Sequence, residues 1–112
     1  MYFGFFRGMT YGNRNEDFDS YKKIKNKLNK TKVLAYLKQL PIAAVAPVST
    51  KEIFTGEYLE QAGLMEDGDF CFPTDFIYYY ENYDIGIPVE YEKYLMNRIY
   101  NTASKEDRVK KS

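Results

Sequence analysis

The chain has 112 residues, with 16 basic and 16 acidic side chains, so its formal net charge is zero. Histidine is absent and cysteine occurs once, which excludes a histidine general base, a Ser-His or Cys-His pair and a disulfide within the chain. Twelve tyrosines and eight phenylalanines make the chain too aromatic to be disordered. We expect one folded domain over residues 1–102 and a disordered polar tail over residues 103–112.

The first forty residues predict a short strand followed by helical structure. Residues 2–6 are aromatic with one glycine, which favours a strand. Asp19 or Ser20 is expected to cap a helix, and Thr31 is expected to cap a further helical stretch that ends before Pro41. Apolar side chains recur at spacings of three and four after the first cap (Tyr21, Ile24, Leu28). The pattern leaves open whether residues 20–40 form one kinked helix or two.

The middle of the sequence predicts antiparallel strands. Residues 42–48 are small and apolar, but Pro47 has no N–H for a strand ladder, so this segment is expected to be an edge strand or an extended connector. Thr55-Gly56 and Asp67-Gly68 are turn signals between short apolar runs. Two linked hairpins would give a meander of three strands, with Phe70 and Phe72 on one face and Cys71 on the other.

Two further helices are expected after the strands. Thr74 or Asp75 should cap a helix over residues 75–82, and Pro88 suits the first position of a helix that runs to about residue 100. The predicted fold class is therefore α+β: a small antiparallel β-meander of three to four strands packed against N-terminal and C-terminal helices. Six aromatic residues are expected to fill the space between the sheet and the last two helices (Phe54, Tyr58, Phe70, Phe72, Phe76, Tyr83).

Charge is segregated along the chain. Residues 20–51 contain eight lysines and no acid, whereas residues 52–92 contain eleven acids and no lysine or arginine. Exposed tyrosines flanked by acids are typical of a protein-binding surface. We therefore predict a non-enzymatic module that binds another protein, expected to be basic, as an immunity protein, an antitoxin or an inhibitor would. The residues assigned to this contact are Asp69, Asp75, Tyr78, Glu81, Tyr91 and Tyr94.

The alternative is a nucleic-acid-associated protein that uses a lysine-rich helix over residues 22–38. Its lysines would neutralise phosphates, but without arginine they are poorly suited to reading bases. The lysines concerned are Lys22, Lys23, Lys25, Lys27, Lys30 and Lys32. No catalytic motif, phosphate-binding glycine loop or calcium-loop spacing is found, so no catalytic residue, metal or cofactor is assigned. A metal-dependent hydrolase built on Asp67, Asp69 and Asp75 is left open as a further possibility.

A third line of inference is a resemblance. Residues 56–64, Asp67-Gly68-Asp69-Phe70, residues 72–76 and 83–88, and Glu90-Tyr91 resemble small uncharacterised proteins of low-GC Gram-positive bacteria and their mobile elements. The similarity covers about residues 32–95, as judged by the turn and cap signals. It implies no activity and assigns no functional residue.

The expected location is the cytoplasm. A single cysteine suits a reducing compartment. The opening residues do not follow the basic-then-apolar pattern of a signal segment, and no apolar run approaches the roughly 18 residues of a membrane span.

Overall fold

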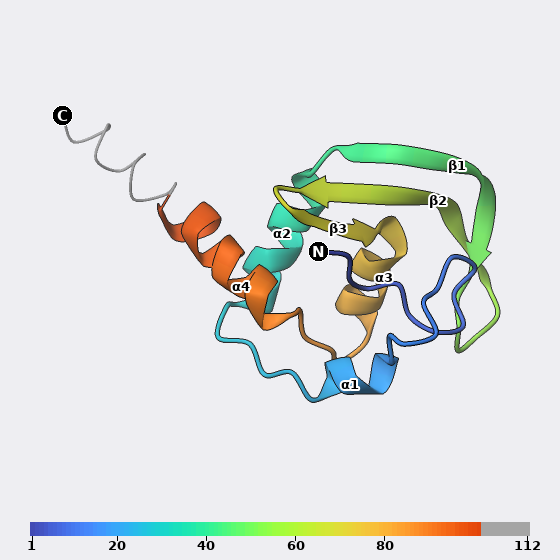
Figure 1. Cartoon of the computed structure of the whole chain (residues 1–112), viewed down its shortest axis with the longest axis horizontal. Coiled ribbons are helices and arrows are strands. Elements are labelled where there is room, and N and C mark those ends of the chain that lie inside the picture. Colours follow the sequence, from blue (N-terminus) through green and yellow to red (C-terminus); the bar gives the residue numbers. More distant parts are fainter. Residues whose placement is uncertain (102–112) are drawn as a thin grey trace.

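The computed structural model describes residues 1–101, so the predicted tail over residues 103–112 lies outside the described residues. The prediction of an α+β fold is confirmed: helices precede and follow the strands in the sequence, and three strands form one sheet (Figure 1). In chain order the elements are α1 (Phe18–Lys22), α2 (Lys30–Gln39), β1 (Ile42–Lys51), β2 (Tyr58–Asp67), β3 (Phe70–Pro73), α3 (Thr74–Asn82), α4 (Val89–Met96) and the π-helical η1 (Asn97–Asn101).

The sheet is the predicted antiparallel meander, with strand order β1-β2-β3. Gly68 makes the turn between β2 and β3 with a φ of 58°, which a residue with a side chain rarely adopts. The predicted turn at Gly56 also connects two strands, but the loop is wider than expected. β1 ends at Lys51, and Gly56 N–H donates to the carbonyl of Glu52 within the loop.

β1 is the predicted edge strand, and it is irregular. Its register against β2 shifts between Val45 and Ser49, the stretch that contains Pro47. A proline cannot donate to the ladder, so extra residues bulge out of the pairing there and the strand bends. Nearly all of β1 is exposed, and only Thr50 is buried.

The predicted strand over residues 2–6 is reduced to a single parallel bridge between Tyr2 and Cys71. Phe3 N–H donates to the Cys71 carbonyl at 3.0 Å, so this segment lies along β3. Gly4 then turns the chain with a φ of 79° and lies against the ring of Phe76, which ends the pairing.

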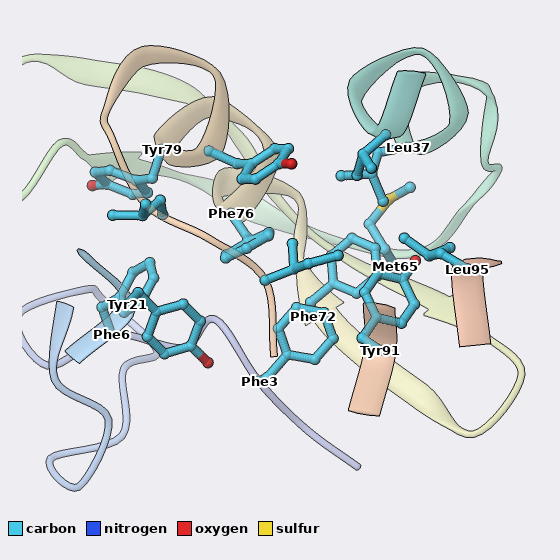
Figure 2. Packing of buried hydrophobic residues seen from close by; sticks show 14 of the residues in the cluster. Phe3, Phe6, Tyr21, Leu37, Met65, Phe72, Phe76, Tyr79, Tyr91 and Leu95 are labelled. Atoms are coloured by element: carbon cyan, nitrogen blue, oxygen red, sulfur yellow. The ribbon is translucent and has the colours of Figure 1, made fainter. Parts of the chain in front are cut away.

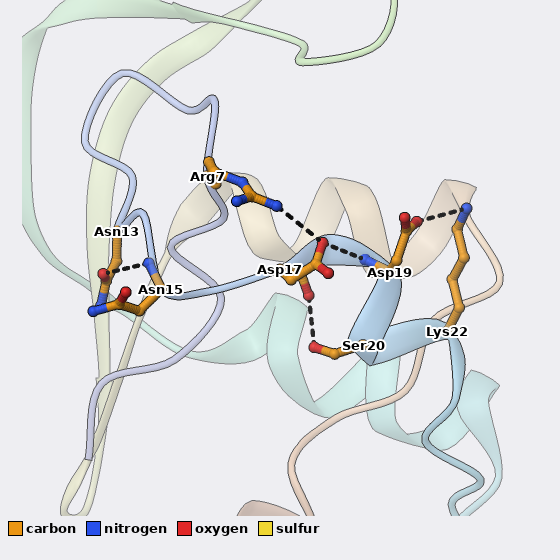
Figure 3. A network of polar contacts seen from close by, with 7 residues as sticks. All are labelled: Arg7, Asn13, Asn15, Asp17, Asp19, Ser20 and Lys22. Carbon is orange, nitrogen blue, oxygen red and sulfur yellow. Dashed lines mark hydrogen bonds and ion pairs between the residues drawn. The ribbon is translucent and has the colours of Figure 1, made fainter.

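The sequence did not decide between one kinked helix and two helices in this region, and the structure has two. Their N-cap residues differ from the predicted ones. Asp17 caps α1 by accepting from the Asp19 N–H at 3.2 Å (Figure 3). Asn29 caps α2 by accepting from the Lys32 N–H at 3.1 Å, so Thr31 lies inside the helix.

The stretch over residues 23–29, predicted as helical, is a connector without helix or strand. Glu92 of α4 accepts the N–H groups of Lys27 and Leu28 at 2.6 and 2.9 Å. Asn26 exchanges two hydrogen bonds with the backbone of Ile87, at 2.8 and 3.0 Å. Partners distant in sequence therefore satisfy backbone groups that a longer helix would have paired internally.

The two C-terminal helices have the expected positions and different caps. Pro73 is the N-cap residue of α3 and Pro88 that of α4, and neither forms a side-chain cap. The prediction that Thr74 or Asp75 caps α3 is wrong, because both lie inside the helix and the Asp75 carboxylate accepts the hydroxyl of Thr50 instead. The predicted last helix is divided into α4 and the π-helical η1, which reaches Asn101.

The core is one continuous cluster of aromatic and aliphatic side chains (Figure 2). Phe3 stacks on Phe72 with ring centroids 5.0 Å apart and also contacts Phe76 and Tyr91. The prediction that Phe54 and Tyr58 fill this core is wrong, since they are 53% and 72% exposed. The N-terminal segment and α1 provide aromatic residues in their place (Phe3, Phe6, Phe18, Tyr21).

Candidate functional site

The structure separates the six residues predicted to contact a partner. Asp69 is exposed at the β2–β3 turn. Tyr91 is fully buried, and its ring packs against Phe3 and Phe72. The prediction that Tyr91 lies on the contact surface is therefore wrong, because its side chain belongs to the core.

Tyr91 and Tyr94 belong to a buried polar cluster centred on Asp67. The Asp67 carboxylate accepts hydroxyl groups from Tyr36 and Tyr91 at 2.8 Å each, and from Tyr94 at 3.1 Å. Burial, with the nearby Asp67 charge, raises the pKa of Tyr91 above its ordinary value. Burial likewise raises the pKa of Tyr36 to about 12. These phenols satisfy a buried acid inside the protein.

A second such cluster is centred on Glu52, in the β1–β2 loop. Its carboxylate accepts the Tyr83 hydroxyl at 2.7 Å, the Tyr78 hydroxyl at 3.3 Å and the Phe54 N–H at 2.7 Å. Burial alone would raise the pKa of Glu52, but these hydrogen bonds together favour the ionised form more strongly and hold the pKa below its ordinary value. Two acids of the negatively charged segment over residues 52–92 thus serve the fold.

Three predicted residues do lie together. Asp75, Tyr78 and Glu81 follow one another at helical spacing on α3 and line a hollow of about 530 Å³, which we call the α3 groove. Side chains of α2 and of the β1–β2 hairpin form its other walls. The apolar members of the lining are Leu37, Leu40, Ile42, Leu59, Met65 and Ile77.

The α3 groove is acidic at its rim. Glu60 and Glu81 are exposed, and Lys38 forms an ion pair with Glu81 at 2.6 Å. Asp75, which is 8% exposed, also lines the groove. The lining therefore combines apolar side chains with three acids and one lysine, which suits a segment with apolar and basic side chains.

A second hollow, of about 280 Å³, is also lined by Asp75. We call it the β1 hollow. Phe5, Met9 and Tyr11 form one wall, and residues of β1 and β2 form the other (Ala44, Val45, Ala46, Ala62, Gly63, Leu64). At its floor the Thr50 hydroxyl donates to Asp75. Burial raises the pKa of Asp75, and the Thr50 hydrogen bond only partly opposes that effect.

Thr50 and Glu92 are important polar residues that were not among the predicted ones. Both are buried, at 4% and 7% exposure, and both bind groups far away in the sequence. The run of small residues over 43–46 is the one sequence signal for the β1 hollow, because small side chains leave space beside a strand.

The lysines assigned to nucleic acid do not share a helix face. Lys22 ends α1 and pairs with Asp19 at 3.2 Å, whereas Lys30 begins α2 and donates to the Tyr83 carbonyl at 2.8 Å. Lys23, Lys25 and Lys27 lie between them on the connector, exposed. The prediction of one basic helix over residues 22–38 is therefore wrong, although several exposed lysines remain close in sequence.

Within residues 1–101, no group of three or more His, Cys, Asp or Glu side chains is arranged to hold a metal ion. Cys71 is a free, half-buried thiol on β3. None of the helices in the described part of the chain is both long and apolar enough to cross a membrane.

Comparison with known proteins found no matching family model, no matching curated protein and no matching solved structure. The resemblance to small proteins of Gram-positive bacteria remains a prediction.

Proposed function

We propose that this protein is a small non-enzymatic module that binds another protein, and that the α3 groove is its contact site. The observation that carries the proposal is that two exposed acids, Glu60 and Glu81, line the same groove as a set of apolar side chains. The partner segment is one with apolar side chains and at least one lysine or arginine. Apolar contact would supply affinity, and the acids would set orientation and association rate.

This proposal keeps the predicted acidic, tyrosine-bearing surface but reduces it to Asp75, Tyr78 and Glu81. Tyr78 is half-buried and lines the groove while its hydroxyl reaches Glu52 at 3.3 Å. A tyrosine fixed in this way loses little side-chain entropy when it is covered by a partner. An immunity protein, antitoxin or inhibitor acting on a basic partner in the cytoplasm is the role that we propose.

The test is selection from a library of random peptides displayed on phage, with the full chain immobilised. We expect enriched peptides to combine apolar residues with lysine or arginine. Binding should fall at least about tenfold in Glu60→Lys/Glu81→Lys, because charge reversal replaces attraction by repulsion. The matched control is Glu57→Lys/Glu66→Lys, which reverses two exposed acids outside the groove.

Two results would overturn the proposal. One is a selection that enriches no peptide family. The other is an equal loss of binding in the groove variant and in its control, which would mean that only the overall charge matters. Duplex DNA is included as a competitor at low salt, because the exposed lysines of the connector would bind it in a salt-dependent manner.

A further inference from the structure

The β1 hollow combines an apolar lining with a buried carboxylate. Apart from Thr10, Thr50 and Asp75, the lining consists mainly of aromatic, methionine, alanine, valine, leucine and proline side chains. Thr50 and Asp75 are 4% and 8% exposed. An apolar hollow with a few convergent polar groups is the usual form of a small-ligand site.

Asp75 lacks a cation in this environment. Among the side chains that the structure describes, one donates a hydrogen bond to this carboxylate, the uncharged hydroxyl of Thr50, and none forms a salt bridge with it. Buried carboxylates are ordinarily paired with a cation or bound by several donors, as Asp67 and Glu52 are in this protein. Burial raises the pKa of Asp75, and the single hydrogen bond from Thr50 offsets this only in part.

The shape of the hollow depends on local features of the sequence. The register shift between Val45 and Ser49 bends β1, and Gly63 of β2 lies so close to Thr74 that a Cβ atom there would be 2.8 Å from its Cγ2. The alanines at 44, 46 and 62 keep the walls short. These residues leave open a space that larger side chains would fill.

We infer that the β1 hollow binds an aliphatic ammonium group attached to a small apolar body, with Asp75 as the counter-ion and Thr50 positioning its carboxylate. The apolar part would lie between Tyr11 and the alanines of β1. A volume of about 280 Å³ lies just below the usual range of ligand pockets, so the expected ligand is a small one. Asp75 lines both this site and the α3 groove, but Glu60 and Glu81 do not line the β1 hollow, so the charge reversal that tests the groove leaves the lining of the hollow unchanged.

The experiment is a titration of the ¹⁵N-labelled full chain, followed by amide chemical shifts, with n-hexylamine, 1-hexanol and n-hexanoate at equal ionic strength. We expect hexylamine to shift the amides of residues 44–46 and 62–64. It should bind at least about tenfold more tightly than hexanol, because an ammonium group binds an ionised carboxylate more strongly than a neutral hydroxyl does. Hexanoate should bind most weakly, because it places a second negative charge beside Asp75.

Two variants test separately what the carboxylate and the cavity contribute to binding. Asp75→Asn should reduce hexylamine affinity to that of hexanol, whereas Glu57→Gln, at an exposed acid, should leave it unchanged. Ala44→Leu should fill the hollow and abolish binding of every probe. Its matched control is Ala43→Leu, which places the same side chain at a neighbouring exposed position that does not line the hollow.

The inference is wrong if hexylamine and hexanol bind equally to the natural chain, or if Asp75→Asn keeps the preference for hexylamine. Should Asp75→Asn fail to fold, hexylamine binding that survives in Ala44→Leu would overturn it. Nα-acetyl-lysine methylamide distinguishes two sources of the ammonium group. Binding of this probe at the same amides assigns the site to a lysine of another protein, whereas binding of hexylamine alone assigns it to a free amine.

Discussion

The hydroxyl of Tyr91 donates a hydrogen bond of 2.8 Å to the carboxylate of Asp67, and both side chains are buried. Tyr36 and Tyr94 also donate to this carboxylate. The acids and tyrosines in which the sequence is rich thus meet inside the protein as well as on its surface. Each of these hydrogen bonds should be measurable as a contribution to stability.

Replacement of Tyr91 by phenylalanine should lower the free energy of unfolding by about 2 kcal/mol, the range for a hydrogen bond to a charged group. Tyr94→Phe should cost about 1 kcal/mol, because Tyr94 is half-buried and its bond to Asp67 is longer, at 3.1 Å. Urea unfolding measures both. Equal losses in the two variants would show that burial does not control the strength of these bonds.

Glu92→Gln should destabilise the connector over residues 23–29. The carboxylate accepts two backbone N–H groups, from Lys27 and Leu28, and a neutral amide oxygen is a weaker acceptor. We expect a loss of about 1–2 kcal/mol and faster hydrogen exchange at these two amides. Glu90→Gln, at an exposed acid of the same helix turn, is the control and should leave both amides protected.

Two glycines with positive φ allow a matched comparison. Gly56 has a φ of 74°, and no atom lies within 4 Å of the position that an added Cβ would take, so Gly56→Ala should cost only the backbone strain of about 1 kcal/mol. Gly68 has a φ of 58°, and its Cβ would lie 2.8 Å from the Tyr94 hydroxyl. Gly68→Ala should therefore cost more and disturb the Tyr94–Asp67 bond. Similar unfolding free energies for the two variants would contradict this account.

The lowered pKa of Glu52 predicts acid sensitivity. Because the folded state holds the pKa of this carboxyl below the ordinary value of 4.5, ionised Glu52 stabilises the protein above that pH. The contribution is lost as pH falls through the lowered pKa. The free energy of unfolding of Glu52→Gln should be smaller than that of the natural chain at pH 6 and should fall less steeply below pH 4.5.

Asp75 should act in the opposite sense, because its folded-state pKa is raised above 3.8. The folded state then retains a proton that the unfolded chain loses, so stability decreases as pH rises from 3.8 through the raised value. Asp75→Asn should abolish this decrease. An NMR titration of the Asp75 carboxyl carbon measures the pKa itself, and a midpoint at or below 3.8 would contradict the prediction.

Most of the backbone can be predicted from the sequence because its signals are local. Pro41 after an apolar stripe, Pro47 in β1 and Asp67-Gly68 between two strands each constrain their own neighbourhood, and the structure confirms all three predictions. The predicted first helix is too long because the lysine-rich segment after α1 has a helical apolar pattern. That pattern does not reveal that Asn26 binds the backbone of Ile87, or that Glu92 binds the backbone of Lys27.

The candidate site can be predicted only in part for the same reason. The sequence places Asp75, Tyr78 and Glu81 in one predicted helix over residues 75–82, and these three line the α3 groove together. It cannot show that Tyr91 faces Asp67, a residue 24 positions away, or that Thr50 meets Asp75 across 25 positions. A sequence analysed one segment at a time shows which acids are present, but not which of them already accept hydrogen bonds from other parts of the chain.

The two hydrogen bonds between Asn26 and Ile87 also constrain when the N-terminal third can become ordered. During synthesis, residues 23–29 leave the ribosome long before residues 87 and 92, which hold them in place. The connector therefore cannot form these hydrogen bonds until nearly all of the 112 residues have been synthesised. Closing a loop of 61 residues is also a slow step in folding. Chains that end before α4 should leave this region accessible to proteases, so a set of C-terminal truncations with limited proteolysis would reveal the point at which the two ends join.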